Sequence, residues 1–193
     1  MTKLEALLKN VRDCTLCVEH LPLGANPIVR AHESSKILII GQAPGTKVHN
    51  SGVPWNDASG DRLRDWLRVD RDTFYDPRNF AIVPMGFCYP GQAKGGGDNP
   101  PSSQCAPKWH DQILKNIANI ELTLLVGMYA QKYYLGARTK RTLSETVRDF
   151  EVFIPNIIPL PHPSWRNTGW IKKNPWFRER NLPYLRDRVE QIL

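Results

Sequence analysis

ILIIGQAPG, the segment from Ile37 to Gly45, places a run of apolar residues directly before a glycine-rich turn. A short, continuous apolar run of this kind is typical of a strand that is buried on both faces of a sheet. Such strands occur in parallel sheets that are covered by helices. The segment therefore predicts an α/β fold in which the glycine-rich loop leaves the carboxyl end of a buried strand.

Strand-like and helical segments alternate along the rest of the chain. Besides residues 36–40, the pattern predicts strands at 80–83, 122–126 and 152–158, and helices at 4–14, 59–67, 103–117, 128–135, 142–150 and 177–193. Ser59 is the expected N-cap of the second helix. This alternation predicts a mostly parallel, four-stranded central sheet with helices on both faces. We see no repeat and no clear linker, so residues 1–193 are interpreted as a single domain.

Composition and charge indicate a globular protein with an anionic partner. The chain has 193 residues, 41% hydrophobic and 23% charged, with a formal net charge of +7. Lys and Arg neutralise phosphates, which favours nucleic acid, although a generically basic surface remains an alternative. No apolar run is long enough to cross a bilayer, and MTKLEALLKN lacks the apolar centre of a signal peptide. We expect a cytoplasmic protein without a membrane partner.

The four cysteines form two pairs. Cys14 and Cys17 are spaced C-x2-C, and 16 residues separate Cys88 from Cys105. Disulfides are not expected in a reducing compartment. Four thiolates suit a [4Fe–4S] cluster or tetrahedral zinc, and four independent core cysteines are the remaining alternative. The second pair lacks the short spacing of a zinc ribbon, which favours the cluster over zinc.

Two motifs follow predicted strands and should therefore meet at one edge of the sheet. GQAPG follows the strand at 36–40, and PLPHPSWRN follows the last strand. In parallel sheets, ligands bind beyond the carboxyl ends of the strands. A nucleotide-binding enzyme, with GQAPG as its phosphate loop, is another possible function. Such a loop requires G-x-x-x-x-G-K-[ST], which is absent here.

The order of CTLC, GQAPG, GVPW, two later cysteines and HPS resembles the uracil-DNA glycosylase superfamily, and most closely its iron–sulfur branch, family 4. The resemblance spans Cys14 to about Asn167. It implies a three-layer α/β/α fold, a [4Fe–4S] cluster on the four cysteines, and DNA as partner. It also implies hydrolysis of the N-glycosidic bond of flipped uracil or a related deaminated base. We expect the protein to act as a monomer.

The resemblance assigns roles to individual residues. Trp55 is expected to stack on the flipped base, and His162 to stabilise the negative charge that develops on uracil O2. Trp165 is a candidate wedge for the gap that the base leaves, although packing against Trp170 or Trp176 is an alternative. The other expected substrate-binding residues are Gly41, Ala43, Met85, Gly86, Ser164 and Arg166.

The sequence departs from the resembling motifs at three positions. Gln42, a candidate catalytic residue, stands where family 4 carries Glu, and Ala43 replaces the Asp of the best-known branch. Pro84 occupies the position of an Asn that reads the uracil edge. Because Pro84 has no donor, we expect backbone groups near Met85 and Gly86, or another side chain, to read the base.

The segment NDASGD resembles the G-D-A-S-G loop of family 5 and supplies a candidate for the missing acid. Asp57 is expected to orient the attacking water and to stabilise the oxocarbenium-like sugar. His49 is a weaker candidate, and Asp61 is better explained as a first-turn helix residue. The alternative function is a non-catalytic iron–sulfur protein that binds DNA, since three family positions lack their polar groups.

Overall fold

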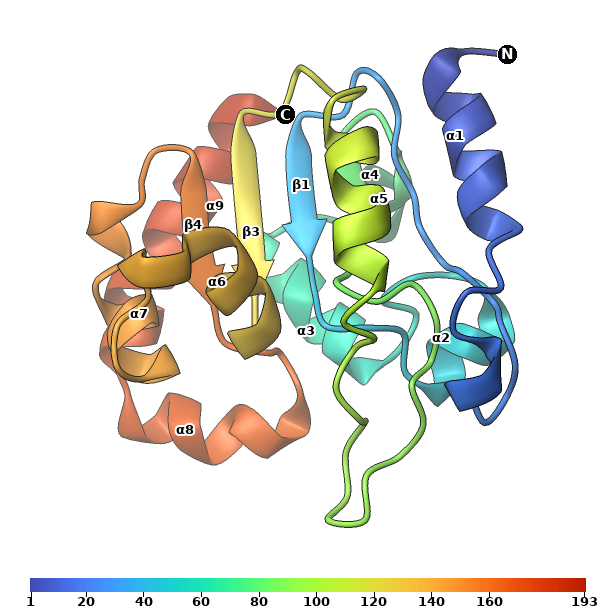
Figure 1. Ribbon diagram of the computed structural model, residues 1–193. Helices are drawn as coiled ribbons and strands as arrows, with labels where there is room; N and C mark the ends of the chain where they lie inside the picture. Colours follow the sequence, from blue (N-terminus) through green and yellow to red (C-terminus); the bar gives the residue numbers. More distant parts are fainter.

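The computed structural model describes residues 1–193 and is organised around one parallel sheet (Figure 1). The four strands are β1 (Ile37–Ile40), β2 (Phe80–Ile82), β3 (Leu122–Val126) and β4 (Ile157–Leu160), in the spatial order β2-β1-β3-β4. Ile39 pairs with Ile82 on one side and with Leu124 on the other. The predicted α/β fold with a four-stranded parallel sheet is thereby confirmed, and the ILII segment is one of its two inner strands.

Helices form a layer on each face of the sheet. The helices are α1 (Lys3–Arg12), α2 (Thr46–Ser51), α3 (Ala58–Leu67), α4 (Arg71–Tyr75), α5 (Cys105–Leu114), α6 (Met128–Leu135), α7 (Leu143–Arg148), α8 (Thr168–Lys173) and α9 (Leu182–Ile192). Short 3-10 turns lie at Val18–His20, Gly136–Arg138, Phe150–Val152 and Trp165–Asn167, and a π turn lies at Phe177–Asn181. The three-layer α/β/α arrangement follows from the two hydrophobic cores that these helices complete.

Alternate residues of β1 enter the two cores, as the two-residue period of a strand requires. Leu38 and Ile40 pack in the core formed with α1, α5 and α6. Ile37 and Ile39 pack in the opposite core, to which α3, α4, α7, α8 and α9 contribute. Burial on both faces explains why the strand has no polar residue.

The predicted bounds of the last strand and of the last helix were wrong. The last strand begins at Ile157 rather than at residue 152, because residues 150–152 form a 3-10 turn. Pro159 lies inside this strand, which is tolerated because β4 is at the edge of the sheet and leaves one side unpaired. The predicted 177–193 helix starts as a π turn, and α9 follows with Pro183 in its first turn, where no N–H is needed.

The N-cap of α3 also differs from the prediction. Asp57, not Ser59, accepts the hydrogen bond of the third helical N–H, that of Gly60, at 2.8 Å. The short helices α2, α4 and α8 were not predicted, since each has too few turns to establish an apolar period. No helix combines the length and apolar character needed to cross a membrane.

Candidate functional site

A cleft of about 620 Å³ lies beyond the carboxyl ends of the strands. Three segments form its walls: the loop between β1 and α3, which contains GQAPG, the loop after β4, and a second glycine-rich segment, residues 91–99, which precedes α5 and is called the glycine-rich loop from here on. This last loop projects beyond the sheet edge in Figure 1. The expected site residues that line the cleft are Gly41, Gln42, Ala43, Trp55, Asp57, His162, Ser164, Trp165 and Arg166. Met85 and Gly86 do not line it.

Trp55 forms one wall of the cleft in a constrained conformation. Its backbone is left-handed, with φ of 56°, which is uncommon for a residue other than glycine. The indole lies against Gly41, and its ring centroid is 5.6 Å from that of His162, with 35° between the planes. Gly60 allows α3 to approach the Trp55 carbonyl, because any side chain at this position would collide with that oxygen.

Asp57 combines a structural contact with a place on the cleft wall. Its Oδ1 accepts the Gly60 N–H, so its carboxylate is held at the N-terminus of α3. A helix N-terminus carries partial positive charge, which stabilises a carboxylate there. The cap therefore fixes the orientation of the negative charge beside Trp55 and His162.

His162 is partly buried in the loop after β4. Burial lowers the pKa of its imidazole, and the nearby negative charge of Asp57 opposes this shift. The lowered pKa favours a neutral imidazole, which donates one N–H. Asn167 Nδ2 donates to the His162 carbonyl at 2.7 Å, and Arg62 Nη1 donates to the Ser164 carbonyl at 2.8 Å. These bonds fix the HPS loop against α3.

The backbone groups near Met85 and Gly86 that were expected to recognise the base already have hydrogen-bond partners inside the protein. The N–H groups of Met85 and Gly86 donate to the carbonyls of Gly41 and Gln42, each at 2.9 Å. The Pro84 carbonyl lies 3.0 Å from His110 Nε2, which must carry the proton because a carbonyl only accepts. Burial lowers the His110 pKa, in keeping with a neutral ring. These bonds hold the end of the strand in place; Pro84 also lines the cleft, whereas Met85 and Gly86 do not.

Gln42 lies on the lining of the cleft, whereas His49 does not. Gln42 Nε2 donates to the Asn99 carbonyl at 3.0 Å and so ties the glycine-rich loop to the end of β1. His49 lies outside the cleft lining, and its ring centroid is 6.2 Å from that of Tyr89.

Trp165 is the most exposed tryptophan side chain at the rim. It is 73% exposed, and the Arg166 guanidinium lies 5.6 Å from its ring centroid. Trp170 and Trp176 instead pack against each other, with ring centroids 5.5 Å apart. Trp165 therefore presents a large apolar surface beside the cleft.

Sequence reasoning did not identify Asp98, which also lines the cleft. It lies in the glycine-rich loop, far in sequence from the other site residues. The available signal was that Asp98 is the one acidic residue between Cys88 and Cys105.

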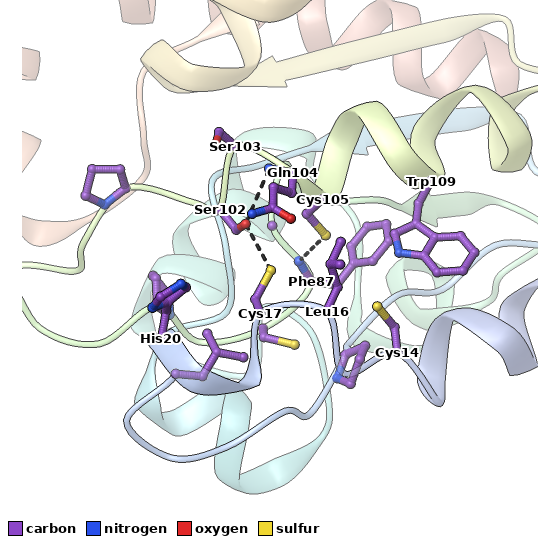
Figure 2. Close-up of a pocket in the computed structure, with 16 residues that line it drawn as sticks. Cys14, Leu16, Cys17, His20, Phe87, Ser102, Ser103, Gln104, Cys105 and Trp109 are labelled. Carbon is purple, nitrogen blue, oxygen red and sulfur yellow. Dashed lines mark hydrogen bonds between the residues drawn. The ribbon is translucent and has the colours of Figure 1, made fainter.

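The four cysteines line a second cavity, of about 280 Å³, between the N-terminal segment and the start of α5. Figure 2 shows Cys14, Cys17 and Cys105 around it, with Cys17 Sγ 3.0 Å from Ser102 Oγ. Burial raises the pKa of the Cys88 thiol, and that of Cys105 to about 12. No group of three or more His, Cys, Asp or Glu side chains is close enough to hold a single metal ion.

Two comparisons with known proteins bear on the chain. The family model described as the Uracil DNA glycosylase superfamily matches residues 29–186. The match includes every residue of the cleft lining except Ile28, as well as Cys88 and Cys105, whereas Cys14 and Cys17 precede it. A crystal structure of wild-type SMUG2 from Pedobacter heparinus is similar at 17% identity, covering 81% of this chain and 74% of that chain, with a TM-score of 0.36.

The contact between α3 and Trp55 predicts the effect of a methyl group at Gly60. Gly60→Ala should lower the free energy of unfolding by about 1–3 kcal/mol, because the added Cβ meets the Trp55 carbonyl. Gly169→Ala is the matched control: it lies in α8 with open space around it and should stabilise by up to about 1 kcal/mol. Urea unfolding measures both values, and equal stabilisation by the two substitutions would contradict the contact.

Proposed function

The chain belongs to the uracil DNA glycosylase superfamily, and we propose that it hydrolyses the N-glycosidic bond of uracil or a related deaminated base in DNA. The observation that carries this proposal is the single cleft in which Trp55, Asp57 and His162 meet. The proposed reaction is that of a monofunctional glycosylase, in which water is the nucleophile.

Trp55 provides the stacking surface for a flipped base. A base that leaves the duplex loses its stacking, and an aromatic ring in the pocket replaces that interaction. The left-handed backbone and the close approach of Gly60 fix the backbone of Trp55, and contacts with Gly41 and His162 hold its indole before substrate binds. The enzyme therefore does not have to order the ring during the reaction.

His162 stabilises the departing base. As the glycosidic bond breaks, its electron pair moves to the base, and negative charge develops on the uracil oxygens. A neutral imidazole donates an N–H to such an oxygen, and burial favours this neutral form by lowering the His162 pKa.

Asp57 places a negative charge near the deoxyribose. The sugar becomes oxocarbenium-like as the base departs, and an ionised carboxylate stabilises that positive charge. The cap bond from the Gly60 N–H uses Oδ1 and holds the carboxylate in one orientation, which also suits the positioning of water.

Duplex contacts come from the rim of the cleft. Trp165 is the proposed wedge, because its exposed side chain lies next to Arg166 and can fill the gap in the stack. The net charge of +7 favours binding to the phosphate backbone.

For the cofactor, we propose a [4Fe–4S] cluster held by Cys14, Cys17, Cys88 and Cys105, as in the family 4-like branch. All four thiols line one cavity whose other lining includes Leu16, Phe87 and Trp109. A single zinc ion would need the sulfurs packed around one point, whereas a cluster has a volume of its own and separates its ligands more widely. When bound, the cluster supplies a structural link between the N-terminal segment and the start of α5.

A second candidate is a DNA-binding protein of the same fold without base excision. It is favoured by the structural use of Gln42, whose amide is engaged by the glycine-rich loop, and by the engaged groups of Pro84 and Met85. Salt-dependent DNA binding without base release would identify this function.

The first test is base release from oligonucleotides that contain uracil, hypoxanthine or xanthine, single- and double-stranded. We expect release by wild type and a single-turnover rate about 100-fold lower for Asp57→Asn, because Asn preserves the helix cap but removes the charge. Asp70→Asn makes the same change at the exposed N-cap of α4 and should leave the rate unchanged. Undetectable release by wild type would contradict the proposed function, and an unimpaired Asp57→Asn would contradict the assigned role.

The second test concerns the cofactor. Protein purified without oxygen should be brown and contain iron and acid-labile sulfide in equal amounts, about four of each per chain. Cys105→Ser should lower both contents, whereas His20→Ala, on the same cavity wall, should lower neither. A colourless protein with one zinc ion would contradict the cluster.

A further inference from the structure

We propose that Asp98 is a second catalytic carboxylate, which accepts the proton of the water that attacks the sugar. The inference rests on the proposed glycosylase function and extends it to a residue of the glycine-rich loop. Asp98 lines the cleft together with Trp55, Asp57 and His162.

The position of Asp98 is defined by a small hairpin, residues 91–99. Asn99 N–H donates to the Gly91 carbonyl at 2.8 Å, and Ala93 N–H donates to the Gly97 carbonyl at 2.9 Å. Gln92 and Asp98 form an antiparallel bridge between these bonds. The hairpin therefore holds Asp98 on a bonded segment rather than on an open loop.

Gln42 anchors this hairpin to the sheet. Its Nε2 donates to the carbonyl of Asn99, the residue next to Asp98, at 3.0 Å. Gln42 stands where the first motif of the resembling branch carries an acid. An amide can donate this bond, whereas an ionised carboxylate cannot. Gln42 therefore ties the segment that bears Asp98 to the end of β1.

The Arg166 side chain, from the loop after β4, lies against Gly97 of the hairpin. Gly97 has φ of 87°, and a side chain there would collide with Arg166 Nη1. The guanidinium therefore lies over the hairpin at close range, where its positive charge attracts the Asp98 carboxylate. The loops after β1 and β4 both contact the segment that bears Asp98.

The two carboxylates of the cleft differ in their bonding. Asp57 accepts the Gly60 N–H, whereas the Asp98 carboxyl has neither a hydrogen bond nor an ion pair in the structure. Asp98 is exposed by surface area, but loss of hydration around its carboxyl still raises its pKa; the charge of Arg166 opposes this shift, and the charge of Asp57 adds to it. A carboxylate with a raised pKa and free oxygens is suited to accept a proton.

Hydrolysis forms one bond to the sugar and breaks one. The oxygen of water forms a bond to C1′ of the deoxyribose, and the bond between C1′ and the base nitrogen breaks. The electron pair of that bond leaves with the base, whose anion His162 stabilises and solvent later protonates. One proton of the water passes to the Asp98 carboxylate and then to solvent, while Asp57 remains a fixed negative charge.

The test is single-turnover kinetics of Asp98→Asn on uracil-containing DNA with enzyme in excess. We expect a rate about 100-fold below wild type, with the Kd for DNA bearing 2′-fluorodeoxyuridine, which resists cleavage, within about twofold. Asp98→Glu, which restores a carboxylate, should recover part of the rate. Lys94→Ala, an exposed change in the same hairpin outside the cleft lining, should leave the rate unchanged.

The outcomes separate this inference from the function on which it rests. If wild type releases uracil and Asp98→Asn does so equally fast, the inference is overturned and the glycosylase function stands. A weaker Kd with an unchanged rate at saturation also overturns it, since Asp98 would then only bind DNA. If wild type releases no base from any substrate, the proposed function and this inference fall together. A melting temperature equal to that of wild type establishes that the Asn variant is folded.

Discussion

The close approach of α3 to the backbone of Trp55 is the contact on which the candidate site depends. Gly60 permits it, because any side chain at that position would occupy the space of the Trp55 carbonyl. The same turn gives Trp55 its left-handed backbone and places Asp57 at the N-cap of the helix. The stacking surface and the fixed carboxylate are therefore two consequences of one local geometry, and His162 meets them from the loop after β4.

Much of the fold could be predicted because buried parallel strands have a simple signature. The strand at 122–126 and the helix at 128–135 have the predicted bounds, since a mostly apolar run and a helical period identify them, respectively. The last strand was misplaced because Val152 and Phe153 are apolar in a turn, while Pro159 lies in the strand and gives the opposite signal. Local pattern does not reveal that β4 is an edge strand, where proline is tolerated.

The site was predictable where residues follow a strand directly and was missed where tertiary contacts decide. GQAPG and HPS meet at one edge because they follow strands of the same parallel sheet. By contrast, NDAS offers three residues able to cap a helix, Asn56, Asp57 and Ser59, and only the packing on Trp55 selects Asp57. Asp98 had no periodic context in its glycine-rich loop, and the bond from Gln42 that brings it to the cleft joins residues 57 positions apart.

The central claim is that this cleft receives a base and that Trp55 is its stacking surface. The most direct measurement is a crystal structure of the Asp57→Asn protein bound to double-stranded DNA with one uracil. The account predicts a uracil outside the duplex, stacked on the Trp55 indole, with an oxygen within hydrogen-bond distance of His162. A uracil that stays in the base stack, or that leaves it for a place away from Trp55, would contradict the account.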